Sequence, residues 1–194
     1  MMGKTHIAVG AAAFSVVTPP PTDIKDFLFW GGQLIVTMIA SVAADIDDPR
    51  TTAGKIILPF VPRWLRPTAF SILGMLLIWH GFQHSIPWVM ACGFFFFGAA
   101  ISKHRNSPTH SPVGLFFLCL LTYLYLPIML IPVFTGYLTH LITDAITEGI
   151  PIMWPFPGWL RIPITETNSF MDRVVFRFGS IIVLGYQVLQ MSFF

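Results

Sequence analysis

The segment Phe94–Leu121 reads FFFFGAAISKHRNSPTHSPVGLFFLCLL, two apolar runs joined by the polar stretch SKHRNSPTHSP at 102–112. The same alternation of apolar runs and short polar segments extends over the whole chain of 194 residues, of which 55% are hydrophobic and 10% charged. A soluble domain carries about 25% charged residues. Lipid offers the backbone no hydrogen-bond partners, whereas a helix satisfies its own N–H and C=O groups. The pattern therefore predicts an integral membrane protein built from a bundle of helices.

Seven apolar segments follow one another along the chain. They cover residues 6–18, 27–44, 68–82, 87–101, 113–126, 128–143 and 174–193. Several are shorter than the ~20 residues of a perpendicular span, so we expect some helices to be tilted, half-inserted or extended by polar residues at their ends. The sequence therefore predicts an all-α, polytopic membrane helical bundle of about 5–7 transmembrane or half-inserted helices. No second domain is indicated, and residues 1–194 are expected to form a single one.

The basic residues are distributed unevenly about this bundle. If all seven segments cross the membrane, ten of the 11 Lys and Arg residues fall on one face and only Lys25 falls on the other. The positive-inside rule places the basic face in the cytoplasm. We therefore expect a multi-pass protein of the inner (plasma) membrane with a cytoplasmic N-terminus. Membrane lipids are the expected partners, because a net charge of +2 does not favour nucleic acid, and the oligomeric state stays open.

Residues of the types that can coordinate metal ions, histidine and aspartate, gather on the same predicted cytoplasmic face, at the ends of apolar segments. The candidate metal ligands are His6, Asp45, Asp47, His104, His110, His140 and Asp144. His80 and His84 fall on the opposite face and serve as an internal contrast. One such residue alone is more often a helix cap or an interfacial group. Polar groups retained in a membrane protein usually pair with one another, with cations or with water, so the prediction rests on the whole set.

Sequence spacing brings some of these side chains together. His140 and Asp144 are four residues apart in HLITD and share one stripe of a helix. Pro108 interrupts the helical pattern between His104 and His110, so a turn can fold the two imidazoles toward each other. Imidazole and carboxylate donors without thiolate suit a catalytic divalent metal, Zn²⁺ first, with Mn²⁺ or Fe²⁺ as alternatives. Seven candidate donors are more than one tetrahedral ion can bind. The site would therefore hold either two ions, or one ion whose ligands are supported by the remaining carboxylates.

Several stretches together resemble the YdjM family of inner-membrane proteins, whose proposed function is metal-dependent hydrolysis. They are THIAVG (5–10), DIDDP (45–49), HRNSPTHS (104–111), GYLTHLITDAITEGIPIMWPF (136–156) and LRIPITETNSFMDR (160–173). The resemblance implies a helical inner-membrane protein with a His/Asp metal site. The order of its His and Asp residues is also similar to that of zinc-dependent phospholipases C and single-strand nucleases. The chain departs from the family pattern at 167–169 and at Asp172, where Thr-Gly-Ser and a glutamate are expected.

Three functions compete at this point. The first is hydrolysis of a phospholipid or other membrane-adjacent phosphoester, with Asp47 as general base and Asp48 as its rival. Arg105 or Arg161 would then bind the phosphate. The second is a non-catalytic role, in which the metal only holds helix ends together. The third, metal transport, is disfavoured because the candidate ligands sit at one end of the bundle rather than along a path through it.

Overall fold

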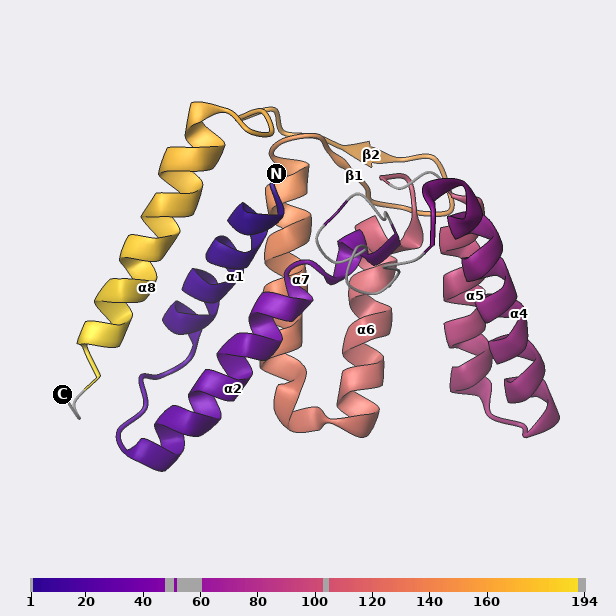
Figure 1. The fold of residues 1–194 in the computed structure, drawn as a ribbon, viewed down its shortest axis with the longest axis horizontal. Helices are drawn as coiled ribbons and strands as arrows, with labels where there is room; N and C mark the ends of the chain where they lie inside the picture. The colour runs from indigo at the N-terminus through magenta and orange to yellow at the C-terminus, as the bar shows by residue number, and fades with distance from the viewer. Residues whose placement is uncertain (1, 48–50, 52–60, 103–104, 192–194) are drawn as a thin grey trace.

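The computed structural model describes residues 2–47, 51, 61–102 and 105–191, and its architecture is helical (Figure 1). Seven α-helices occupy the described chain: α1 (Gly3–Val17), α2 (Ile24–Ala40), α4 (Arg66–Gln83), α5 (Pro87–Ile101), α6 (Pro112–Tyr125), α7 (Leu130–Ala145) and α8 (Gly179–Leu189). Each lies on one of the predicted apolar segments. The all-α prediction is thus confirmed.

Short elements connect these helices. Four are 3₁₀-helices: η1 (Ala43–Asp47), η2 (Arg63–Leu65), η3 (Pro108–His110) and η4 (Pro127–Met129). A π-helix, η5 (Met171–Phe178), leads directly into α8. Two short antiparallel strands, β1 (Ile150–Pro151) and β2 (Trp159–Leu160), pair Ile150 with Leu160 and Pro151 with Trp159.

Local sequence explains where several helices begin. Pro87 and Pro112 occupy the first positions of α5 and α6, where the missing N–H of proline costs no helical hydrogen bond. The Asp23 carboxylate caps α2 by accepting from the Asp26 backbone N–H at 2.8 Å. Helix ends are thus set by residues that the polar segments supply.

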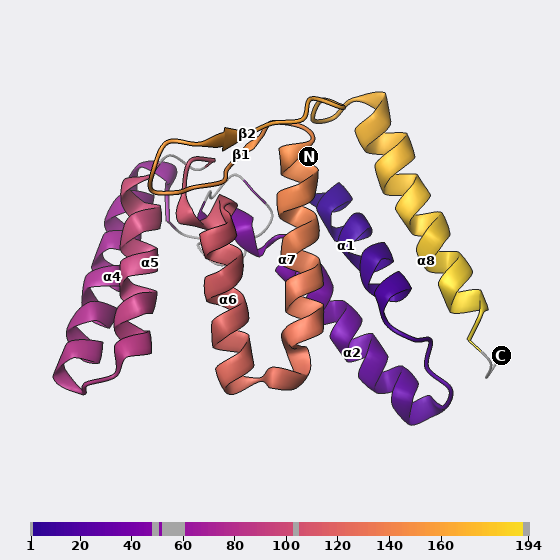
Figure 2. The same cartoon turned by 180° about the vertical axis from the view of Figure 1, so that it is seen from behind.

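Successive long helices alternate in direction, as Figures 1 and 2 show from opposite sides. The N-terminus, the start of α6, the end of α7 and the β1–β2 pair consequently lie at one end of the molecule, which we call the site end. The turns from α1 to α2, from α4 to α5 and from α6 to α7 lie at the other end.

Helix α7 is central and contacts α1, α2 and α6. Gly136 allows the last turn of α2 to approach α7 closely, because a Cβ atom there would lie 2.9 Å from the Ala40 Cβ and 3.0 Å from the Ser41 backbone nitrogen. Gly10 of α1 meets the same segment, and a Cβ atom at this position would lie 2.8 Å from the Ser41 Cβ. The close approach brings the end of α2 against the part of α7 that carries His140.

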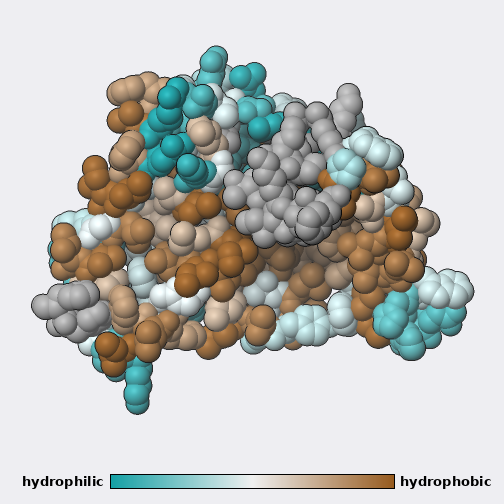
Figure 3. Space-filling model, viewed as in Figure 1, coloured by the Kyte–Doolittle hydropathy of each residue, from teal (hydrophilic) through white to brown (hydrophobic). Residues whose placement is uncertain are grey.

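Besides two small apolar clusters, the described chain buries many polar side chains and exposes many large apolar ones. The largest fully buried side chains include His6, His110, His140, Asp47 and Asp144, whereas isoleucine, leucine and phenylalanine side chains on α2, α6 and α8 are exposed. Figure 3 shows hydrophobic residues across the middle of the molecule and hydrophilic ones at its upper edge. A soluble protein has the reverse distribution, and an exterior of this kind suits hydrocarbon.

Helix length limits which of the described segments can cross a membrane by themselves. Within the described ranges one helical stretch, Pro127–Ala145 with 19 residues, is long and apolar enough to cross a membrane. Pro87–Ile101 and Pro112–Tyr125 are apolar but shorter. A perpendicular span needs about 20 residues, so the predicted number of crossings stays a prediction.

Candidate metal centre

Three imidazoles and two carboxylates meet at the site end, although they come from four different elements. Asp144 on α7 lies between the imidazoles: its Oδ1 is 3.4 Å from His6 Nε2 of α1, and its Oδ2 is 3.4 Å from His140 Nε2. His110 Nε2 of η3 lies 3.8 Å from Asp144 Oδ2 and 3.4 Å from Asp45 Oδ1 of η1. We call these five residues the His/Asp cluster.

The imidazole rings are packed against one another. His6 and His140 stack with ring centroids 4.1 Å apart and an interplanar angle of 21°, and His110 meets His140 edge-on at 5.3 Å. All three rings are buried, and Asp144 is 2% exposed. Asp45, at 14%, is the most exposed member of the cluster. Solvent or a ligand therefore has its best access on the Asp45 side.

Hydrogen bonds at Nδ1 fix the tautomer of two of the rings. His140 Nδ1 lies 2.8 Å from the Ser41 carbonyl oxygen, which only accepts, so Nδ1 carries the proton. The Thr143 hydroxyl donates to the backbone carbonyl of His140 at 2.9 Å, so its oxygen accepts from His6 Nδ1 at 2.7 Å. Each ring therefore directs the lone pair of Nε2 toward Asp144. Ring orientation by an outer hydrogen bond is characteristic of metal-binding histidines.

The third ring is held by the short helix η3. Thr109 Oγ1 lies 3.1 Å from His110 Nδ1 and 2.6 Å from the Ser107 hydroxyl, and all three side chains are buried. The Tyr137 hydroxyl donates to the Thr109 carbonyl and so ties η3 to α7. The hydroxyl residues of the polar segment thus position His110.

The cluster fits a divalent metal ion. Two groups, His6–His140–Asp144 and Asp45–His110–His140, have ligand atoms within 4.8 Å of one another and could each hold an ion. Donors about 2.0–2.1 Å from a tetrahedral Zn²⁺ lie roughly 3.3 Å apart, close to the three 3.4 Å separations. Among the described residues, His140 Nε2 is buried without a hydrogen-bond partner, as expected of a nitrogen reserved for a metal.

Electrostatics keep one carboxylate ionised. Burial raises the pKa of Asp45, but the His110 imidazole, 3.4 Å from its Oδ1, and the other imidazoles of the cluster outweigh this effect and hold the pKa well below its usual range. Asp45 therefore presents an anionic oxygen at neutral pH, the form that binds a cation.

The other acidic and imidazole candidates have different outcomes. Asp47 is fully buried in η1, yet it belongs to neither of the two groups; its backbone carbonyl accepts from the Arg66 guanidinium. His104 and Asp48 lie outside the described residues. The contrast pair behaves as expected: His80 and His84 stand near the end of α4, distant from the site end, with exposed rings 4.5 Å apart.

The two candidate arginines also differ. Arg105 lies beside the cluster, with Nη1 3.6 Å from Asp144 Oδ2, and it is 33% exposed. Its Nε donates to Glu148 Oε2 at 2.9 Å. Arg161 is exposed and donates to the Thr147 carbonyl at 3.1 Å, and no contact with the cluster is found within the part of the chain that the structure describes.

Glu148 was not predicted from the sequence, although it holds Arg105 in place. The Thr167 hydroxyl donates to its Oε1 at 2.5 Å and fixes the carboxylate from the other side. A signal was present, since Glu148 follows Asp144 by four residues and so extends the stripe that begins at His140. Thr167 belongs to the segment where the chain departs from the family pattern, and this contact gives it a position next to the site.

This geometry defines the class of protein: an all-α protein whose buried imidazole–carboxylate cluster, at one end of the bundle, could hold a metal ion. The family model described as YdjM inner membrane protein matches residues 1–192. The chain therefore belongs to the YdjM family, and the resemblance seen in the sequence is confirmed. No curated protein and no solved structure matches the chain.

Proposed function

We propose that the protein is a membrane-embedded, metal-dependent hydrolase of a phospholipid or other membrane-adjacent phosphoester. The observation that carries the proposal is the convergence of three buried Nε2 atoms and two carboxylates beside Arg105, a cation that is one-third exposed. A divalent ion held by the cluster supplies a Lewis acid that activates water and polarises a phosphoryl oxygen. Zn²⁺ suits the donors best, with Mn²⁺ or Fe²⁺ as alternatives.

Arg105 and Glu148, beside the cluster, receive roles that follow from their contacts. Arg105 is the phosphate-binding residue, because a guanidinium can donate two parallel hydrogen bonds to phosphate oxygens. Glu148 orients it through the 2.9 Å bond to Nε. Further roles rest on the sequence alone: Asp47 or Asp48 as the general base and Arg161 as a further phosphate ligand.

The proposal places the cluster at the cytoplasmic membrane interface. Most Lys and Arg residues fall on this face in a seven-crossing topology, which puts the N-terminus in the cytoplasm. Basic residues near the surface attract anionic headgroups at about 1 kcal/mol each. A phosphoester at headgroup depth is therefore the electrophile that can reach the site.

The competing proposal is a structural metal. It is favoured by the burial of His6, His140 and Asp144, because structural sites are closed whereas catalytic sites keep one position open. An ion bound there would join α1, η1, η3 and α7. Asp45 and Arg105 are partly exposed, which leaves the open side that a catalytic metal site needs. For this reason we prefer the catalytic proposal to the structural one.

Turnover distinguishes the two proposals. Purified protein loaded with Zn²⁺ and reconstituted in phosphatidylglycerol vesicles is expected to release a water-soluble phosphate product, and a chelator should stop the release. Asp144→Ala and His110→Ala should abolish it, while His84→Ala should leave it unchanged. Full metal occupancy without turnover across a broad lipid panel would refute the hydrolase proposal and favour the structural one.

A further inference from the structure

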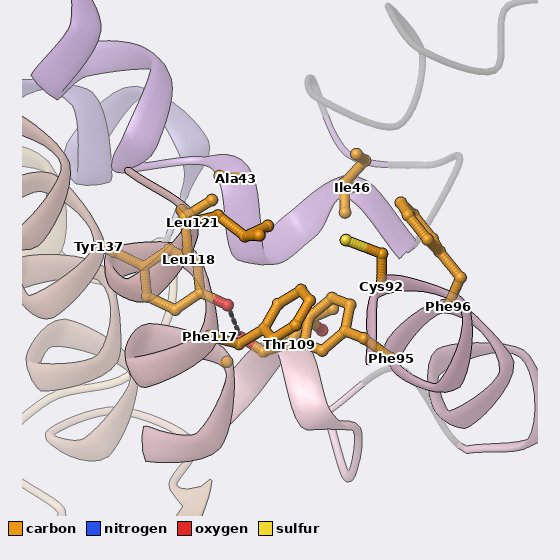
Figure 4. A pocket seen from close by; sticks show the side chains of 11 residues that line it. Ala43, Ile46, Cys92, Phe95, Phe96, Thr109, Phe117, Leu118, Leu121 and Tyr137 are labelled. Atoms are coloured by element: carbon orange, nitrogen blue, oxygen red, sulfur yellow. Dashed lines mark hydrogen bonds between the residues drawn. The ribbon is translucent and has the colours of Figure 1, made fainter. Parts of the chain in front are cut away.

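An apolar cavity of about 170 Å³ lies against η1 and η3, the two short helices that carry Asp45 and His110 (Figure 4). Its walls come from η1, α5, η3, α6 and α7. The side chains from α5 and α6 are Cys92, Phe95, Phe96, Phe117, Leu118 and Leu121. The Cys92 sulfur and the rings of Phe95 and Phe117 border the same space.

The cavity and the cluster share a wall. Ile46 lines the cavity and stands directly after Asp45 in η1. Thr109 lines it as well, and its hydroxyl contacts His110 Nδ1 at 3.1 Å. Tyr137, which bonds to the Thr109 carbonyl, closes the side toward α7. The cavity therefore lies directly behind residues that carry or position two members of the cluster, Asp45 and His110.

The residues that line the cavity from α6 extend along that helix. Gly114, Phe117, Leu118 and Leu121 line it from α6 at spacings of three and four residues, which places them on one stripe. Seven residues of helix rise about 10 Å. Since α6 begins at the site end, the stripe leads from the cluster toward the middle of the molecule.

The reason for the cavity is the position of the α4–α5 hairpin. Gly74 and Gly93 let these two helices pack tightly on each other, since a Cβ atom at Gly74 would lie 2.8 Å from the Gly93 carbonyl oxygen. The hairpin meets α6 through a stack of Phe95 on Phe117, with ring centroids 4.9 Å apart. An apolar gap left beside this contact forfeits dispersion energy unless hydrocarbon fills it.

We infer that the cavity binds one hydrocarbon chain of the lipid whose phosphoester lies at the His/Asp cluster. This inference rests on the proposed function and adds that the substrate is recognised by its acyl chain as well as by its phosphate. An apolar cavity of 150 Å³ stays dry and holds benzene, so this one accommodates roughly six carbon atoms of a chain. The bilayer supplies such chains at the required depth.

Photo-crosslinking tests the inference without requiring turnover. The probe is phosphatidylglycerol with a diazirine near the carboxyl end of one acyl chain, presented in vesicles to the Zn²⁺-loaded protein. Peptides that contain Phe95 and Leu121 are expected to be labelled. Cys92→Phe, which fills the cavity, should lower this labelling at least tenfold. Cys119→Phe is the matched control, because Cys119 is equally a half-buried free cysteine but does not line the cavity.

Each outcome bears on the inference. A metal content equal to that of the wild type would show that Cys92→Phe is folded. Leu121→Trp, which fills the same space from α6, serves as a second variant. Unchanged labelling in both variants would overturn the inference, as would equal labelling by a diacylglycerol that carries the same diazirine but no phosphate. Labelling of the cavity without any hydrolysis would sustain the lipid site and refute only the enzymatic proposal. Hydrolysis without labelling would refute the lipid site in the cavity and sustain the enzymatic proposal.

Discussion

Thr143 offers a sharp test of the metal centre, because the only imidazole that its hydroxyl contacts among the described residues is that of His6, at Nδ1; its other contact with the cluster is the His140 backbone carbonyl. The hydroxyl oxygen accepts from His6 Nδ1 at 2.7 Å and thereby leaves Nε2 free of a proton. Thr143→Val keeps the size of the side chain and removes the acceptor. The buried His6 N–H is then unsatisfied unless the ring adopts the other tautomer, which presents a proton to the metal instead of a lone pair.

The expected loss follows from this contact. Leaving a buried donor unsatisfied costs about 1–3 kcal/mol, and removing the hydrogen-bond partner of a metal-binding histidine typically weakens metal affinity 10–100-fold. Tenfold corresponds to about 1.4 kcal/mol, so the two estimates agree. We therefore expect the Zn²⁺ dissociation constant of Thr143→Val, measured by competition with a chromogenic chelator, to rise 10–100-fold.

Two controls make this result specific. Thr139→Val alters the same residue type one helical turn earlier, where the hydroxyl donates to the Gly136 carbonyl at 2.8 Å, and it should leave the affinity within about twofold. Thr143→Ser restores an acceptor and should recover most of the loss. An affinity of Thr143→Val equal to that of the wild type would show that His6 is not oriented for a metal, and the reasoning would be refuted.

Further predictions concern phosphate binding, packing and topology. Arg105→Ala should raise the KM for a phospholipid substrate and leave the metal content nearly unchanged, because the guanidinium lies 3.6 Å from Asp144 and is predicted to contact phosphate rather than the ion. A fall in metal content as large as the fall in substrate affinity would contradict this role. Gly136→Ala should lower thermal stability by about 1–3 kcal/mol, read as a lower melting temperature in detergent, because the new methyl group would clash with the Thr37 carbonyl oxygen and with Ala40 and Ser41 at the end of α2. A reporter active only in the cytoplasm should be silent at the C-terminus and active at the N-terminus; activity at both ends would remove the seven-crossing topology.

The helices could be predicted closely from the sequence, since the polar segments that separate them carry proline and helix-capping residues. The predicted segment 87–101 coincides with α5, and 113–126 differs from α6 by one residue at each end. The π-helix η5 and the β1–β2 pair had no comparable signal. They depend on contacts between distant segments, such as the bond from the Met2 backbone N–H to the Asp172 carboxylate.

The candidate site was predictable where local geometry decides it. His140 and Asp144 share a helical stripe, and the structure joins them as expected. Asp45 and Asp47 are both candidate ligands by residue type, but η1 is a 3₁₀-helix with three residues per turn, so side chains two residues apart point in different directions. Asp45 lies 3.4 Å from His110 Nε2, whereas Asp47 belongs to neither of the two groups of ligands. The partner of Arg105 depends on tertiary packing, which no spacing rule encodes.

Metal content tests the central claim most directly. Protein purified without chelators, offered Zn²⁺, Mn²⁺ and Fe²⁺ and freed of excess ions, should retain at least one divalent ion per chain by elemental mass spectrometry. His84→Ala should retain the same amount, whereas His140→Ala, which removes the residue common to both groups of ligands, should retain less than about a tenth. A wild-type protein without stoichiometric metal, or a His140→Ala variant with the wild-type content, would contradict the account.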